Sequence, residues 1–286
     1  MKHELAIAHR VCPVLAKTAA GFDDKLEMVE ATTASLAAAL EGIDAKLTVV
    51  LDGCPPEYAR LFDDTFAGSR VAYSRVETPA IGNRATYMKQ HAILSADADS
   101  ARFLYFSEDD YLYRPGAFRA MMDFLAEPGV DFATPLDHPD RYSRAMPESR
   151  RVEIRVSRSC HWRESGTTCC TFMTKSETFR ETSDRLAAYG RGSGDGGMWL
   201  GLTKDRIFSP SATIGAALRY LAGRRLTPQG LEFSVLSAWR FHKWKLPFGR
   251  RYRLWSPMPT LSVHLCKPSL PPFGDACGGA ATFAHR

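Results

Sequence analysis

The sequence predicts an α/β protein with a mostly parallel sheet flanked by helices. Three observations lead to this prediction. Short apolar segments alternate with helical patterns over the first 136 residues, which is typical of strand–helix–strand crossovers. Two of these segments end in acid, at Asp52 and at Glu108–Asp110. The 286 residues, 45% of them hydrophobic, are enough for one large core or two modest ones.

The first half is predicted to alternate strands and helices. β-Branched and aromatic residues indicate strands at 4–11, 46–53, 70–77, 102–110 and 130–136. Helical periodicity, capping residues and Pro or Gly at the ends indicate helices at 23–42, 55–68, 83–96 and 115–129. Ligands bind beyond the carboxyl ends of parallel strands, so the two acidic strand ends are where a functional site is expected.

The second half changes character after a polar, Arg-rich stretch at 138–160. Strands are expected at 152–157, 167–174 and 260–266, and helices at 175–190 and 231–245, the last one aromatic and basic. A glycine-rich loop enters a short helix at 190–202. We therefore divide the chain into a first half at 1–137, a second half of the same domain at 138–270 and a loose tail at 271–286.

Charge and cysteine content favour a cytoplasmic protein that takes small anionic ligands. The net charge of +5 is mild, far from that of a dedicated nucleic-acid binder. Seven cysteines without a C-x-x-C pair are expected to be reduced thiols, and a zinc site from Cys160, His161, Cys169 and Cys170 has poor spacing. Neither a signal peptide nor a transmembrane segment is expected.

The acidic triplet in "FLYFSEDDYLY" is the most informative stretch. Side chains alternate along a strand, so Glu108 and Asp110 are expected to share one face and Asp109 to point to the other. Neighbouring carboxylates repel, and a divalent cation with open positions for phosphate oxygens would compensate them. The alternative is a solvated acidic turn that caps the helix after Pro115.

The order of "VVLDG", the next two helices and "YFSEDDYLYRPGAF" resembles the GT-A glycosyltransferases, especially the inverting, family-two-like group. The resemblance covers about residues 4–204 and extends toward His264. It implies that the E-D-D motif holds Mn²⁺ or Mg²⁺, which grips the diphosphate of a nucleotide sugar. Asp110 would be the direct metal ligand, and Glu108 and Asp109 would contact ribose, sugar or metal-bound water.

The same resemblance assigns a nucleotide contact to the end of the second strand. Asp52 would accept a hydrogen bond from the base, with a turn-forming Asp-Gly as the alternative. The family often has two acids here, where this chain has Leu51 and Asp52. The first strand also departs from the family pattern, because it ends in "AHRVCP" and leaves His9 or Arg10 as a guessed contact.

A helix start at 82–84 is a second expected contact with the donor. Gly82, Asn83, Arg84 and Lys89 would touch the nucleotide, because helix N-termini attract anions. The alternative is a capped surface helix with solvated charges.

The resemblance places the catalytic base in "GRGSGDGGMWLGL". Asp195 would remove a proton from the acceptor hydroxyl, the glycines would allow close approach of the sugar, and Trp199 would stack on a sugar face. A helix-capping Asp is the alternative, and Glu164 is the reserve base. The late His264 would be a further metal ligand, although a lone His on an apolar strand is more often a core residue.

These inferences converge on a metal-dependent hexosyltransferase-type enzyme. It would move a sugar, with inversion, from a UDP- or GDP-type donor to a glycan or lipid-linked acceptor in bacterial surface-polysaccharide synthesis. In this scheme residues 1–137 bind the nucleotide sugar and residues 138–270 bind the acceptor. The rival classes are a sugar-phosphate nucleotidyltransferase, disfavoured because "AHRVCPVLAKTAAG" lacks a glycine-rich basic loop, and a non-catalytic nucleotide-sugar or nucleic-acid-binding module. The basic aromatic segment after Leu231 is either a packing helix or a peripheral membrane contact.

Overall fold

The computed structural model describes residues 2–15, 21–138, 152–210 and 231–266, together with Ile214, Gly215 and Leu218. The expected tail at 271–286 and the polar stretch at 139–151 lie outside the described residues. The six cysteines in the described part of the chain are all free thiols. The helices are α1 (Lys25–Ala39), α2 (Pro56–Phe66), α3 (Asn83–Asp97), α4 (Ala117–Leu125), α5 (Ser176–Leu186), α6 (Gly194–Thr203), α8 (Leu231–His242) and α9 (Lys245–Phe248).

A large sheet with the strand order β3-β2-β1-β4-β9-β6-β10-β8-β7 forms the centre of the molecule. β5 and β11 form a separate antiparallel pair. The strands are β1 (His3–Val11), β2 (Ala45–Asp52), β3 (Ala72–Thr78), β4 (Ala101–Glu108), β5 (Tyr111–Tyr113), β6 (Phe132–Ala133), β7 (Ile154–Val156), β8 (His161–Ser165), β9 (Phe172–Lys175), β10 (Leu254–Met258) and β11 (Ser262–His264).

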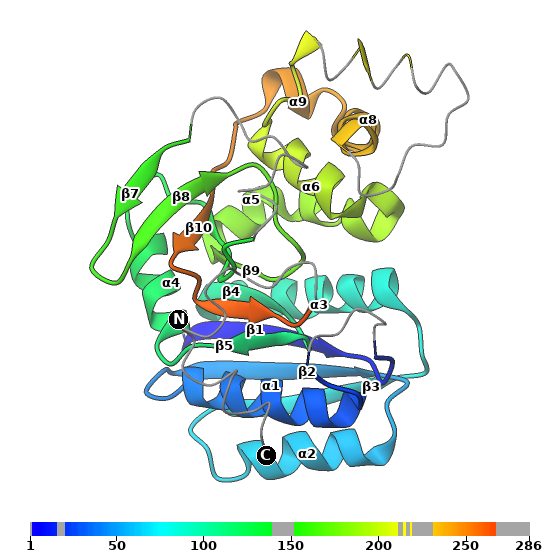
Figure 1. Ribbon diagram of the computed structural model, residues 1–286, viewed down its shortest axis with the longest axis vertical. Coiled ribbons are helices and arrows are strands. Elements are labelled where there is room, and N and C mark those ends of the chain that lie inside the picture. The colour runs from blue at the N-terminus through cyan, green and yellow to red at the C-terminus, as the bar shows by residue number, and fades with distance from the viewer. Residues whose placement is uncertain are drawn as a thin grey trace.

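The first four strands of the sheet are parallel, as the alternating pattern predicts. β1 lies between β2 and β4, and β3 forms the edge. Figure 1 shows these strands in the lower half of the molecule, with α1 and α2 on one side and α3 on the other. The α/β class with helices on both faces is therefore confirmed, and the carboxyl ends of β1, β2 and β4 meet at one edge.

Alternation along the strands builds a separate core on each face. Leu5 and Ile7 of β1 join one buried cluster, whereas Ala6 and Ala8 join the other. β4 divides in the same way, because Tyr105 packs in the first cluster and Phe106 in the second. Burial on both faces explains why these strands are nearly continuous apolar runs.

The second half of the sheet differs from the prediction. β9 is inserted antiparallel between β4 and β6, and β10 joins β6 to β8. β5, β8 and β10 were not expected, and the strand expected at 130–136 is only the two residues of β6. The helix expected at 231–245 breaks after His242, where Lys243 adopts a positive φ of 41°.

Candidate functional site

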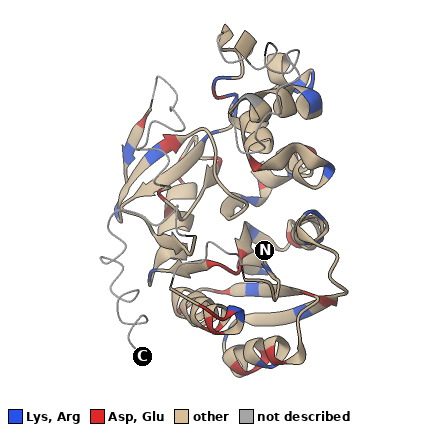
Figure 2. Cartoon of the chain, turned by 45° about the vertical axis from the view of Figure 1, so that its right-hand side comes forward, with Lys and Arg blue, Asp and Glu red and all other residues tan. Residues whose placement is uncertain are grey.

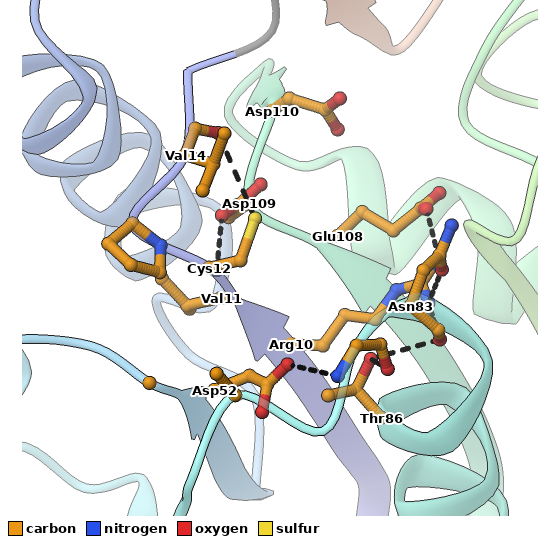
Figure 3. Close-up of a pocket in the computed structure, with 14 residues that line it drawn as sticks. Arg10, Val11, Cys12, Val14, Asp52, Asn83, Thr86, Glu108, Asp109 and Asp110 are labelled. Atoms are coloured by element: carbon orange, nitrogen blue, oxygen red, sulfur yellow. Dashed lines mark hydrogen bonds and ion pairs between the residues drawn. The ribbon is translucent and has the colours of Figure 1, made fainter.

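A cavity of about 440 Å³ opens at the carboxyl ends of the parallel strands, where the sequence predicts a site (Figure 3). It lies between the segment after β1, the end of β2, the start of α3 and the end of β4. The residues that line it are Arg10, Val11, Cys12, Pro13, Val14, Asp52, Gly53, Ala80, Gly82, Asn83, Thr86, Glu108, Asp109 and Asp110.

The acidic triplet separates as the alternation predicts. Glu108 and Asp110 extend to one side in Figure 3, and Asp109 points the other way, toward Cys12. The Asp109 carboxylate accepts a hydrogen bond from the Cys12 backbone N–H at 3.0 Å and pairs with Lys25 Nζ at 2.8 Å. Burial raises the pKa of Asp109 to about 6, against the opposing effect of Lys25. Asp109 therefore ties the end of β4 to β1 and α1.

Glu108 is held by a buried arginine. Arg10 donates to one Glu108 oxygen, and Thr171 Oγ1 donates to the other at 2.9 Å. Arg10 also donates to the Asn83 carbonyl at 2.9 Å and to the Asn83 side chain. Although burial opposes it, the negative charge of Glu108 raises the pKa of Arg10. Arg10 therefore joins β1, β4 and the start of α3, and both carboxylate oxygens of Glu108 are occupied.

Asp110 meets His264, a residue 154 positions later in the chain. The pairing of β11 with β5 places His264 opposite Tyr111, and the His264 ring stacks on Tyr111 with centroids 4.7 Å apart. His264 Nε2 lies 2.9 Å from Asp110 Oδ2. Although burial works against it, His264 lowers the pKa of Asp110, and Asp110 in turn raises the pKa of His264. The two residues that the sequence predicts as metal ligands are therefore neighbours.

The Asp110–His264 pair fits a divalent cation that takes most of its ligands from elsewhere. Asp110 Oδ1 and His264 Nδ1 are buried and have no hydrogen-bond partner. Oδ2 and Nε2 are hydrogen-bonded to each other at 2.9 Å, so His264 would have to release this bond before its Nε2 could ligate an ion, whereas Asp110 Oδ1 is already unpartnered. Three or more His, Cys, Asp or Glu side chains do not converge on one metal position anywhere in the described ranges. Mg²⁺-like ions often use one or two protein ligands and complete their shell with phosphate oxygens and water.

Asp52 lines the cavity, but its carboxylate already accepts three hydrogen bonds. Ile81 N–H and Thr78 Oγ1 donate to one oxygen, and Gly82 N–H donates to the other. These bonds fix the turn that leads into α3. Gly53 is required beside this turn, because a Cβ there would lie 2.7 Å from the Ala80 Cβ. The contact of Asp52 with a base stays a prediction.

Only part of the expected α3 contact surface faces the cavity. Gly82 and Asn83 line it, with Gly82 at a φ of 85°. Arg84 and Lys89 are exposed and are not among the lining residues. A Cβ at Gly192 would lie 3.4 Å from the Arg84 guanidinium, so Arg84 lies against the turn at Tyr189–Ser193 that precedes α6.

Asp195 lies in the first turn of α6, with its side chain exposed. Its Oδ1 accepts a hydrogen bond from Gly196 N–H at 2.7 Å. Desolvation raises the pKa of Asp195, and the negative charge of Glu108 raises it further. Its charge also acts on the buried Cys170 beside Glu108. Asp195 is thus within range of the charge of Glu108, but it is not among the residues that line the cavity.

Trp199 corrects the expectation of a sugar-stacking residue. Its side chain is 0% exposed, packs edge-on against Phe132 and Phe172, and donates to the Cys169 carbonyl at 3.2 Å. An apolar ring on the inner face of α6 belongs to the core. Trp199 supports α6 from behind and cannot stack on a ligand in this conformation.

The glycines around Asp195 also have a different role from the one expected. A Cβ at Gly196 would lie 2.3 Å from Ser234 Oγ, and one at Gly197 would lie 2.6 Å from Ser237 Oγ. These glycines face α8, so they permit the close crossing of two helices. Close approach of a sugar is not what requires them.

Two other candidates are displaced from the cavity. Glu164, the reserve base, pairs with Arg251 at 2.7 Å and Arg253 at 3.1 Å on the far half of the sheet. His9 is buried against Ser107 and does not line the cavity, whereas Arg10 does. The four residues proposed for a zinc site do not converge as a metal site within the described ranges.

Lys25 is the principal residue that the sequence did not reveal. Its side chain is 7% exposed and neutralises Asp109. A cation in the first turn of a helix is unfavourable for the helix dipole, and that mismatch was the available signal. Tyr189 and Thr171, which bind Asn83 and Glu108, carried no comparable signal.

Comparisons with known proteins find distant likenesses in structure only. No protein-family model and no curated protein matches the sequence. TarS 1–349 of S. aureus matches with a TM-score of 0.41 and 13% identity over 63% of this chain and 49% of that one. The complex of the same fragment with UDP-GlcNAc matches with a TM-score of 0.40 and 12% identity, over 63% of this chain and 48% of that one. The glycosyltransferase GlyE of Streptococcus pneumoniae matches with a TM-score of 0.46 and 10% identity, over 99% of this chain and 61% of that one.

The chain therefore spans about half the length of the TarS fragment. At these identities and TM-scores the neighbours do not by themselves assign an activity. The functional proposal accordingly rests on the chain's own residues.

Proposed function

We propose that the protein is a metal-dependent, inverting glycosyltransferase of the GT-A type that uses a nucleotide-diphosphate sugar. The observation that carries this proposal is the Asp110–His264 pair, which has two unpartnered buried polar atoms and whose Asp110 borders a cavity at the carboxyl ends of parallel strands. A volume of about 440 Å³ is in the range of small-molecule sites.

Asp110 and His264 would hold Mn²⁺ or Mg²⁺. When bound, such an ion supplies charge stabilisation to the departing diphosphate. Glu108 and Asp109 would act indirectly, since Arg10 and Lys25 already neutralise them. Their role in this scheme is to fix the strand end and thereby the direction of Asp110.

The remaining lining residues would bind and orient the donor. Asn83 lines the cavity, and the first turn of α3 that it begins favours an anionic ligand. Asp52 keeps one oxygen with a single recorded donor, which leaves it able to accept a further hydrogen bond from a base. UDP and GDP types of donor both remain candidates.

Asp195 would be the general base. It would take the proton of an acceptor hydroxyl as that oxygen forms the new bond to the anomeric carbon, while the bond to the diphosphate breaks on the opposite side. A raised pKa suits a carboxylate that must hold a proton near neutral pH. Its exposed position leaves room for an acceptor glycan.

A thermal-shift screen of nucleoside diphosphates with and without Mn²⁺ tests this proposal. A ligand at about 100 times its Kd adds about 2.7 kcal/mol of stability, which corresponds to a rise in Tm of roughly 5 °C. We expect one nucleotide to give this rise only with metal, and Asp110→Asn to abolish it. Equal stabilisation of the wild type and of the variant would contradict the proposal.

A further inference from the structure

A pair of aromatic rings protrudes from the lobe that carries α8 and α9. We call the residues Lys243, Trp244, Lys245 and Phe248 the α9 patch. Trp244 is 76% exposed and Phe248 is 81% exposed, and their rings stack with centroids 6.2 Å apart. α9 lies at the upper end of the molecule in Figure 1, away from the parallel strands. Large aromatic side chains rarely face water in pairs unless they contact something else.

The turn that presents the patch is held in place from below. Leu246, between the two aromatics, is fully buried against Leu200 of α6 and Val235 of α8. Lys243 adopts a φ of 41°, a conformation that costs free energy for any residue except glycine. Strain of this kind persists where the surrounding structure imposes it, often at functional positions. The outward direction of Trp244 and Phe248 is thus a fixed feature of the fold.

The patch lies in a basic environment. The sequence contains no Asp or Glu between Phe233 and Gly274, but it does contain Arg240, Lys243, Lys245, Arg250, Arg251 and Arg253. Four of these cations pair with carboxylates of neighbouring elements: Lys245, Arg250, Arg251 and Arg253. Lys243 and Arg240 have no carboxylate partner among the residues that the structure describes. Figure 2 shows blue basic positions on these uppermost helices.

We propose that the α9 patch docks the protein on an anionic lipid bilayer. Tryptophan and phenylalanine partition into the interface between water and acyl chains, and Lys243, which pairs with no described carboxylate, reaches lipid phosphates. The exposed rings stack on each other and protrude, so they form no slot for a base or a peptide. The longest described helices, α1 and α3, have 15 residues each, and no helix among the described residues could span a bilayer.

Docking through α9 would also orient the candidate site. α8 crosses closely over Gly196 and Gly197 of α6, next to Asp195. A membrane-bound α9 would hold the Asp195 side of the molecule near the bilayer, where a lipid-linked acceptor would lie. This last consequence rests on the proposed function, whereas lipid binding itself does not.

Vesicle binding of the full chain tests the proposal without any enzyme assay. Phosphatidylcholine vesicles are compared with vesicles that also contain about 30 mol% phosphatidylglycerol. The wild type should sediment with the anionic vesicles only, and less so at high salt. Trp244→Ala/Phe248→Ala should weaken partitioning roughly tenfold or more. Ile154→Ala/Val156→Ala is the matched control, because these residues are also exposed, at 57% and 71%, on the edge strand β7, and it should bind like the wild type.

Tryptophan fluorescence gives an independent measurement. Of the other four tryptophans, Trp162, Trp199 and Trp255 are fully buried and Trp239 is half-buried beside Phe208. A blue shift on adding anionic vesicles that is lost in Trp244→Phe therefore comes from Trp244. The proposal would be overturned if the double alanine variant bound anionic vesicles as well as the wild type does. It would also be overturned if the wild type did not bind anionic vesicles. The proposal would also be overturned if the wild type formed a dimer, the double alanine variant were a monomer, and neither bound lipid. The patch would then be the contact with a second copy of the chain.

Discussion

Replacing Lys25 by methionine should destabilise the protein strongly, because Asp109 is buried and would lose the cation that pairs with it. The two side chains are 7% and 11% exposed, and Nζ lies 2.8 Å from Oδ2. At an effective dielectric constant of about 20, two charges at this distance attract by about 6 kcal/mol. Desolvation offsets part of this attraction, and breaking a buried pair typically costs about 3–5 kcal/mol.

Part of that cost is recovered at the helix start. Removing a cation from the first turn of α1 returns up to about 1 kcal/mol through the helix dipole. We therefore expect Lys25→Met to lower the free energy of unfolding by about 3 kcal/mol and Tm by roughly 5 °C. Urea and thermal denaturation followed by circular dichroism measure both quantities.

Two further variants separate the buried charge from other effects. Lys25→Met/Asp109→Asn removes both charges and keeps an acceptor for the Cys12 N–H, so it should regain most of the lost stability. Arg180→Met breaks an exposed pair with Asp99, whose side chain is 93% exposed, and should cost less than about 1 kcal/mol. A loss of less than about 1 kcal/mol in Lys25→Met would refute the reasoning, since the pair would then be effectively solvated.

Three other predictions concern the site and its support. Asp195→Asn should lower kcat by roughly 100- to 10,000-fold in a sugar-transfer assay while nucleotide binding is retained; weakened nucleotide binding with kcat unchanged would exclude the base role. Asp195 must be deprotonated to act as a base, and its pKa is raised. As the pH falls, kcat should therefore decline at a higher pH than it would with an ordinary aspartate. A kcat that stays constant down to about pH 4 would contradict this. Gly197→Ala should lower the free energy of unfolding by about 1–3 kcal/mol, because its Cβ would lie 2.6 Å from Ser237 Oγ. An unchanged urea denaturation curve would contradict this and show that α8 can move aside without cost.

Local patterns in the sequence predicted the parallel half of the fold well. Most residues of β1, β2 and β4 are buried, on one face of the sheet or the other, so the apolar runs and their acidic ends are visible in the chain itself. The same local logic predicted that Asp110 and Asp109 point in opposite directions. His264 came instead from the family resemblance, as a further metal ligand beside Asp110, and the pairing of β11 with β5 places the two side chains next to each other.

What the sequence could not show depends on contacts between distant segments. The insertion of β9 between β4 and β6 is antiparallel and non-local, and short strands such as β6 carry almost no pattern. Trp199 and the glycines of α6 were misassigned because an aromatic and small residues next to an acid are typical of a sugar site. Here α8 packs on the glycines and the core takes the tryptophan.

The central claim is that Asp110 and His264 hold a divalent cation shared with a nucleotide diphosphate. Anomalous diffraction from a crystal soaked with Mn²⁺ and a nucleoside diphosphate tests it most directly. The account predicts an anomalous peak in contact with both side chains and with the diphosphate. A peak elsewhere, or nucleotide bound in the cavity with no metal beside Asp110, would contradict it.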